Sequence, residues 1–317
     1  MGNRKTVISG IDSRLQSCYH TTMKRIISRF ALFLTLAVLF ACASSAPAGQ
    51  SGSSVWKISK DGNALFLGGS VHILRSKDFP PPREFDRAFA QSSMLVLEAD
   101  IEKLADANIA QYLMTQMFLP DDKTLVSVLD PPTYELLKVK SAAAGIPIEN
   151  LARLKPAMVV NILSIMEMQS FGFVQMGIDS HYLEKAQQTG KPLGFLETVE
   201  AQIDMLVGMG DGYENDFVRY SLNDMENSEK EITAIVAEWR KGKARSTEAA
   251  ISEMRETWPV LYKTMLTDRN AAWMPRIEEY LAAGQNVFII AGLAHMHGPD
   301  GLLRMLELSG CTIEQFR

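Results

Sequence analysis

The sequence predicts an α/β or α+β fold, a single large domain in which helices wrap a mixed central β-sheet. Short apolar strands alternate with helices near both ends of the chain, whereas the middle is almost entirely helical. The chain has 317 residues, and the part from about residue 55 onward is long enough to bury one large core. Two predicted strands, 64–68 and 287–291, also run into the same motif, Gly-x-x-His.

The N-terminal segment has the pattern of an export signal. A basic stretch, 23–29, precedes an apolar run, 30–40, which is too short to span a membrane comfortably and has the flanks of a secretory signal. Leu39-Phe40-Ala41-Cys42 resembles a bacterial lipobox. This pattern predicts lipidation of Cys42 and anchoring in the cell envelope on the periplasmic side. Cleavage by an ordinary signal peptidase near Ala46 or Ala48 is the alternative.

These assignments divide the chain into three parts. Residues 1–42 form the leader and signal, 43–54 are small and polar and predict a flexible tether, and 55–317 form the folded domain. Either Met1 or Met23 serves as the start, because the basic part of a signal is usually short.

Charge and cysteine content exclude several classes of protein. The net charge is −5 and no basic patch is present, which argues against a nucleic-acid partner. The three cysteines are Cys18, Cys42 and Cys311. With Cys18 in the leader and Cys42 carrying lipid, Cys311 has no disulfide partner, and we expect it to pack in the core. A bridge between Cys42 and Cys311 is the weaker alternative.

The first half of the domain begins with a predicted hairpin. Residues 55–58 alternate in polarity, Asp61-Gly62-Asn63 is a turn signal, and 64–68 form the returning strand. Three prolines, 80–82, then break the chain before a short amphipathic helix over 83–92. The apolar segment 94–97 predicts a buried strand that ends in the carboxylate of Glu98. Helical patterns follow over 101–117 and 131–144. The segment 151–171 begins with a loop and Pro156 and then runs long and apolar, which predicts a core helix.

The second half returns to alternating strands and helices. Asp179 is placed to cap a helix over 180–188, and a strand over 193–196 runs into Glu197. Helices are predicted over 199–206, 216–241, 246–254 and 260–281. The second motif strand leads to His295, and a helix over 301–308 precedes a last strand near 311–313.

Four polar residues stand at or just beyond predicted strand ends: His72, Glu98, Glu197 and His295. In layered sheets, residues at the carboxyl ends of strands gather where ligands bind. Two imidazoles and a carboxylate can bind a divalent metal and leave a position for a reactive water, with a second carboxylate as base. We therefore expect His72, Glu98 and His295 to meet at one edge of one sheet.

A structural reading competes with this hypothesis. One Gly-x-x-His motif carries little information, and a histidine at a strand end is more often hydrogen-bonded than ligating. His297, two residues beyond His295, also competes for the second position. Two equivalent motifs at the two ends of the domain favour a metal or catalytic site, without excluding either alternative.

The ordered set of motifs resembles the TraB/GumN family, within the superfamily that includes the Tiki proteins. The resemblance extends from about Val55 to Phe316. The matching segments are Gly69-Ser70-Val71-His72, Leu95-Val96-Leu97-Glu98, Gly177-Ile178-Asp179, Gly190-Lys191-Pro192, Leu196-Glu197-Thr198, Ala201-Gln202, Asp268-Arg269-Asn270, Gly292-Leu293-Ala294-His295 and Gly298-Pro299-Asp300-Gly301-Leu302-Leu303.

The resemblance implies a metal-dependent protease, with manganese or cobalt and with zinc as a further option. Carried over, His72 and His295 are metal ligands and Glu98 is a ligand or the general base. Arg269 and Asn270 become catalytic polar residues. The remaining matched residues, which would support the ligands or contact the substrate, are Asp179, Glu197 and Gln202.

The leading hypothesis is an exported, lipid-anchored metal-dependent hydrolase that acts on a peptide or protein substrate. The alternative is a non-enzymatic envelope lipoprotein that binds metal, haem or a glycan. In a third reading the histidines only hydrogen-bond within the fold. Convergence of the four polar strand ends around an open cavity favours catalysis, whereas their separation well beyond the reach of a metal leaves both metal readings without support.

Overall fold

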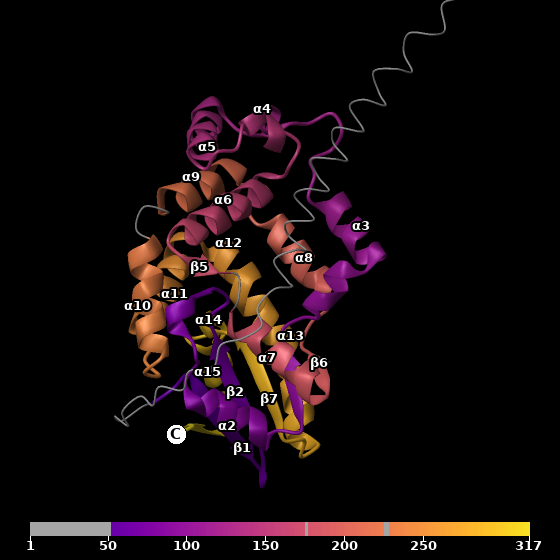
Figure 1. Ribbon diagram of the computed structural model, residues 1–317, viewed down its shortest axis with the longest axis vertical. Coiled ribbons are helices and arrows are strands. Elements are labelled where there is room, and N and C mark those ends of the chain that lie inside the picture. Colours follow the sequence, from indigo (N-terminus) through magenta and orange to yellow (C-terminus); the bar gives the residue numbers. More distant parts are fainter. Residues whose placement is uncertain (1–51, 175–176, 225–227) are drawn as a thin grey trace, which may run out of the picture. The chain divides into compact units, whose positions relative to one another are not determined.

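The structure is a computed structural model that describes residues 52–174, 177–224 and 228–317 (Figure 1). The predicted signal, the lipobox and Cys42 lie outside these residues. The packed chain includes Ser53 and Ser54, which the sequence places in the tether. Both are buried, and Ser54 Oγ donates to the Trp239 carbonyl at 3.1 Å.

The centre of the domain is a mixed sheet with the strand order β6-β4-β7-β2-β1-β8. The predicted hairpin is confirmed, with Val55 opposite Gly68. Strand β7 pairs in parallel with both β2 and β4, and β4 pairs in parallel with β6. The carboxyl ends of these four strands therefore share one edge of the sheet. The strands are β1 (Val55–Lys60), β2 (Asn63–Ser70), β4 (Met94–Leu97), β6 (Leu193–Phe195), β7 (Val287–Gly292) and β8 (Thr312–Gln315).

Helices cover both faces of this sheet, as an α/β fold requires. On one face, α2 (Arg83–Gln91) and α7 (Ile178–Thr189) pack the rings of Phe85 and Tyr182 against Phe288 of β7. Helix α14 (Leu293–Met296) packs against the opposite face of β2. It also contacts α15 (Leu302–Leu308), and α15 in turn contacts α13 (Asp268–Ala282). Strand β7 is buried along its whole length, as expected for a central parallel strand.

The middle of the chain forms a helical layer with its own apolar core. Leu125, Leu137, Val159, Leu163 and Val218 are buried there. In Figure 1 its helices α4, α5, α6 and α9 lie together, away from the sheet. The helices of this part of the chain are α3 (Ala107–Gln116), α4 (Leu125–Val128), α5 (Pro131–Ala143), α6 (Pro156–Ser170), α8 (Val199–Gly208), α9 (Glu214–Asp224), α10 (Ser228–Trp239), α11 (Arg245–Thr257) and α12 (Pro259–Tyr262).

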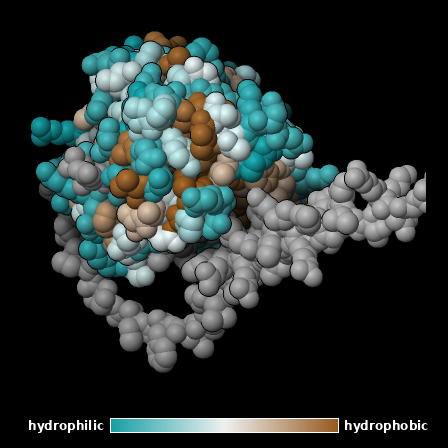
Figure 2. Space-filling view, turned by 90° about the horizontal axis from the view of Figure 1, so that it is seen from above, coloured by the Kyte–Doolittle hydropathy of each residue, from teal (hydrophilic) through white to brown (hydrophobic). Residues whose placement is uncertain are grey.

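The surface of the helical layer is mixed in polarity. Seen from above, its hydrophobic residues form small areas among hydrophilic ones (Figure 2). Val126 on α4 and Val139 on α5 are among the exposed large apolar residues. No helix within the described ranges is both long and apolar enough to cross a membrane.

Several element boundaries differ from the predictions. The helix predicted over 101–117 is interrupted by Asp106, whose carboxylate accepts from the Asn108 and Ile109 amides and so starts α3. Within the helix predicted over 216–241, the described residues are helical as α9 and α10, on either side of residues 225–227. The core helix predicted after the loop at Pro156 is confirmed as α6, which begins at Pro156. A two-stranded sheet of β3 (Leu74–Arg75) and β5 (Phe173–Val174) was not predicted. Cys311 is buried, as expected, and within the described ranges it has no disulfide partner.

Candidate functional site

The polar residues predicted at strand ends come together at the carboxyl edge of the sheet. His72 follows β2, Glu98 follows β4 directly and Glu197 follows β6. His295 lies three residues beyond the end of β7, on the short helix α14 rather than at the strand end itself. His72 Nε2 lies 4.0 Å from Glu98 Oε1, and both Glu197 and His295 are joined to Glu98 through Arg269.

Glu98 is the buried carboxylate at the centre of the cluster, with 8% of its side chain exposed. Its Oε1 accepts from the Gly292 amide at 2.7 Å. Its Oε2 accepts from Arg269 Nη2 at 2.6 Å and from Gln202 Nε2 at 3.2 Å. Burial alone would raise the pKa of the Glu98 carboxyl. The nearby His295, His72 and Arg269, with the Gly292 amide, outweigh burial and lower this pKa to about 2.

His72 forms the exposed rim of the cluster, with 61% of its side chain exposed. Its Nδ1 lies 2.9 Å from Asp179 Oδ2, so Nε2 is the nitrogen that faces Glu98. The Asp179 carboxylate raises the pKa of His72 to about 9, and water at the rim screens part of this attraction. The cap role predicted for Asp179 is wrong, because α7 starts at Ile178 and the Asp179 carboxylate binds His72 instead.

Two glycines allow His72 to sit where it does. A Cβ on Gly177 would overlap the His72 backbone carbonyl, so only glycine permits α7 to start this close. A Cβ on Gly292 would lie 2.9 Å from His72 Nε2 and 3.4 Å from Glu98 Oε1. The glycine of the second motif therefore leaves room for the histidine of the first.

His295 is buried, and its hydrogen bonds determine its tautomer. Asn270 Nδ2 donates to the Asp300 carbonyl at 2.7 Å, so Asn270 Oδ1 is the atom that accepts from His295 Nδ1, also at 2.7 Å. A guanidinium can only donate, so His295 Nε2 accepts from Arg269 Nη1 at 3.0 Å. Burial lowers the pKa of His295 to about 4. His295 is therefore neutral, with its proton on Nδ1 and its lone pair on Nε2.

Arg269 connects the members of the cluster. Its guanidinium donates to Glu197 from Nε at 3.1 Å and from Nη2 at 2.6 Å, in addition to Glu98 and His295. Its Cζ lies 4.6 Å from the centre of the Trp273 ring, and Trp273 Nε1 donates to Glu197 Oε2 at 3.0 Å. Trp273 was not predicted as a site residue. Its spacing of four from Arg269 on one helix is the sequence signal that could have identified it.

A π-helical turn over Lys263–Thr267 precedes Arg269 and Asn270. The sequence predicts an uninterrupted helix over 260–281. The observed turn widens the backbone immediately before α13, and the Met265 carbonyl accepts from Arg269 Nη1 at 3.4 Å. Such turns occur often at functional sites because they change which face a side chain occupies.

His297, the competitor for the second histidine position, makes different contacts. Its Nδ1 lies 3.7 Å from Glu248 Oε1, and its ring packs edge-on against Trp56 at 5.5 Å. His295, by contrast, bonds Arg269 and Asn270 directly. The structure thus joins His295 to the cluster around Glu98.

The donor set fits a divalent cation in its chemistry and in part of its geometry. His72 Nε2 and Glu98 Oε1 face each other at 4.0 Å, and each imidazole has its Nδ1 fixed by a neighbouring oxygen, as metal-ligating histidines usually do. The third nitrogen, His295 Nε2, accepts from Arg269. Within the described ranges, no three histidine, cysteine or carboxylate side chains are grouped closely enough to hold an ion without a shift. Arg269 Nη1 must leave His295, and His72, whose pKa is raised to about 9, must lose the proton on Nε2, before three donors are available.

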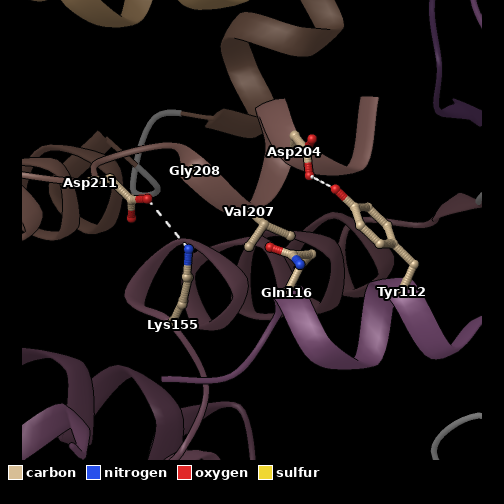
Figure 3. A pocket seen from close by; sticks show the side chains of 7 residues that line it. All are labelled: Tyr112, Gln116, Lys155, Asp204, Val207, Gly208 and Asp211. Carbon is tan, nitrogen blue, oxygen red and sulfur yellow. Dashed lines mark hydrogen bonds and ion pairs between the residues drawn. The ribbon is translucent and has the colours of Figure 1, made fainter. Parts of the chain in front are cut away.

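A separate polar hollow lies at the C-terminal end of α8 (Figure 3). It has a volume of about 270 Å³. Lys155 Nζ lies 3.4 Å from Asp211 Oδ2 at one side, and Tyr112 Oη donates to Asp204 at 2.6 Å on the other. None of the predicted site residues lines this hollow. The residues that line it are Tyr112, Gln116, Lys155, Asp204, Val207, Gly208 and Asp211.

We expect acid to destabilise the protein between about pH 6.5 and pH 4 through His295. The native state resists protonation because burial lowers the pKa of His295 to about 4, whereas the unfolded chain takes up this proton near pH 6.5. The unfolded state therefore binds more protons in this range, and the free energy of unfolding falls by about 1 kcal/mol per pH unit as the pH falls. Urea denaturation in the presence of a chelator measures this slope. An equal slope in His295→Asn would contradict the assignment.

Known proteins are similar to this chain over most of the folded domain. The chain is 23% identical over 253 residues to the uncharacterized protein YbaP of Escherichia coli K12, covering 79% of this chain and 90% of that protein. It is 22% identical over 241 residues to the uncharacterized YbaP of Shigella flexneri, covering 75% of this chain and 86% of that protein. No solved structure matches the chain. The sequence model of the TraB/PrgY/gumN family matches residues 54–315. The chain therefore belongs to the TraB/PrgY/gumN family.

Proposed function

We propose that the chain is an exported, lipid-anchored metal-dependent hydrolase of the cell envelope, with peptide bonds as its first substrate class. One observation carries the proposal. The Nδ1 atoms of His72 and His295 are held by Asp179 and Asn270, so both Nε2 atoms turn toward the groups around Glu98. A purely structural role for His72 and His295 would not require both Nδ1 atoms to be held so that both Nε2 atoms face the groups around Glu98.

The ligands of the ion would be His72 Nε2, the Glu98 carboxylate and His295 Nε2. Two nitrogens and one oxygen suit manganese, cobalt or zinc. When bound, such an ion lowers the pKa of a water molecule and polarises the carbonyl of a substrate.

The chain's own residues orient and stabilise the reacting groups. Asp179 and Asn270 hold the two rings, and Gln202 and the Gly292 amide hold the Glu98 carboxylate. Substrate would approach from the rim, where His72 is the exposed member of the cluster. Arg269 supplies a positive charge beside the reacting centre, where negative charge develops on the substrate oxygen.

The test is a metal-reconstitution assay on the purified full-length protein. Protein stripped with a chelator is reloaded with manganese, cobalt or zinc and given a panel of peptides and esters. We expect His72→Ala and His295→Ala each to lose bound metal and at least about 100-fold of the hydrolysis rate. His297→Asn serves as the matched histidine control and should retain both.

Two outcomes would count against the proposal. Unchanged metal content in His72→Ala and His295→Ala would show that these two histidines do not bind the metal. Metal binding that depends on both histidines, without cleavage of any substrate in the panel, would instead support an envelope protein that binds its ligand without turnover.

A further inference from the structure

The lone pair of His295 Nε2 has room for one partner. Because His295 Nδ1 donates its proton to Asn270, Nε2 is the only nitrogen of this ring that can bind a cation. That lone pair accepts from Arg269 Nη1 at 3.0 Å. A metal ion on His295 and the guanidinium of Arg269 therefore exclude each other.

Arg269 also binds the Glu98 carboxylate, a second group that is proposed to ligate the ion. Its Nη2 lies 2.6 Å from Glu98 Oε2. The Glu98 side chain is buried, with 8% of it exposed. A buried carboxylate without a positive partner is strongly destabilising. Arg269 supplies that partner for Glu98, so this one side chain satisfies two of the three predicted ligands.

A second anchor for the guanidinium does not involve any predicted ligand. Glu197 accepts from Arg269 Nε at 3.1 Å and from Nη2 at 2.6 Å, and the Trp273 ring lies against Cζ at 4.6 Å. Glu197 is held in turn by Trp273 Nε1. Arg269 can thus give up His295 and Glu98 while Glu197 and Trp273 continue to hold it.

We propose that Arg269 is the internal counter-cation of this site, which holds the Glu98 and His295 donor atoms and releases them to a divalent metal while remaining attached to Glu197. The inference rests on the proposed metal-dependent function and concerns how metal loading of the same site is controlled. It predicts that Arg269 opposes metal binding and that Glu197 promotes it.

The experiment compares two variants with opposite expected effects. The dissociation constants for Mn²⁺, Co²⁺ and Zn²⁺ are measured by competition with a chromophoric chelator on the full-length protein. We expect Arg269→Met to bind metal about tenfold more tightly, because the competing charged hydrogen bonds are gone. We expect Glu197→Gln to bind about tenfold more weakly, because Arg269 then relies on Glu98 and His295. Arg276→Met, which removes a half-exposed arginine from the same helix, should leave the affinity unchanged.

Thermal stability and NMR provide a second readout. Arg269→Met should lower the melting temperature of chelator-treated protein and show a larger rise on metal addition than the wild type. Zn²⁺ added to the wild type should also shift the Nε–H NMR signal of Arg269, identified by its loss in Arg269→Lys. This signal decides the question if Arg269→Met does not fold.

The outcomes separate this inference from the proposed function. Weaker metal binding in both Arg269→Met and Glu197→Gln, or an unmoved Arg269 signal, would overturn the counter-cation role while the metal site itself stands. Absence of metal binding in the wild type would overturn both the proposed function and the inference built on it.

Discussion

Replacement of Glu98 by glutamine is expected to abolish metal binding and to reduce hydrolysis by at least about 100-fold. The reason lies in the three donors that surround this carboxylate. Oε1 accepts from the Gly292 amide, and Oε2 accepts from Arg269 and Gln202. A glutamine has one oxygen and one NH₂ group, so in either orientation its NH₂ faces a buried donor.

The same replacement should lower the free energy of unfolding by about 1–3 kcal/mol, because a buried donor is left without an acceptor. Urea denaturation, metal analysis and the peptide assay on Glu98→Gln measure the three effects. Glu278→Gln, an exposed position on α13, is the control for the loss of one negative charge. Retention of stoichiometric metal in Glu98→Gln would contradict a ligand role for Glu98.

Gly292→Ala is expected to remove activity while leaving the fold intact. Its Cβ would lie 2.9 Å from His72 Nε2, closer than such atoms approach. Gly292 has φ −52° and ψ 138°, which alanine adopts without strain. Because His72 is largely exposed, its ring can rotate away from Glu98 at little cost in stability. We therefore expect at least about a 100-fold loss of rate with less than about 1 kcal/mol of destabilisation.

Two comparisons test the cause of this loss. Gly208→Ala is the matched control, because the nearest atom to a Cβ there is Asp211 Oδ2 at 3.8 Å. The double variant Gly292→Ala/His72→Ala should be no worse than His72→Ala alone, since both changes act on the same ring. Additive losses would show that Gly292 acts through another group.

The candidate residues that the strand pattern itself identified share one property, a fixed place relative to a strand, whereas the helical candidates such as Arg269 came only from the resemblance to a family. His72 and Glu98 follow apolar strands whose buried runs are legible in the sequence, and parallel pairing brings their ends together. His295 was found by its motif, although it lies on a helical turn beyond its strand. The strand order was not predicted, because pairing between distant segments leaves no local pattern.

The contacts that the sequence did not reveal are tertiary ones. Asp179 has the local pattern of a helix cap, but its long-range bond to His72 decides its role. The Gly292 amide is a backbone donor and carries no side-chain signal at all. Trp273 has the pattern of an ordinary core residue on α13, which it also is. The π-helical turn before Arg269 is likewise invisible to a helical period.

The parallel pairing of β2 with β7 determines when the site can assemble during synthesis and folding. Phe66 near the start of the domain lies beside Phe288 near its end, and the donors of the cluster come from segments on both sides of this join. A chain still emerging from the ribosome has β2 without β7 and so has His72 and Glu98 without His295. The cluster therefore assembles only after β7 and the segment that carries His295 have been synthesised and have paired with the N-terminal strands.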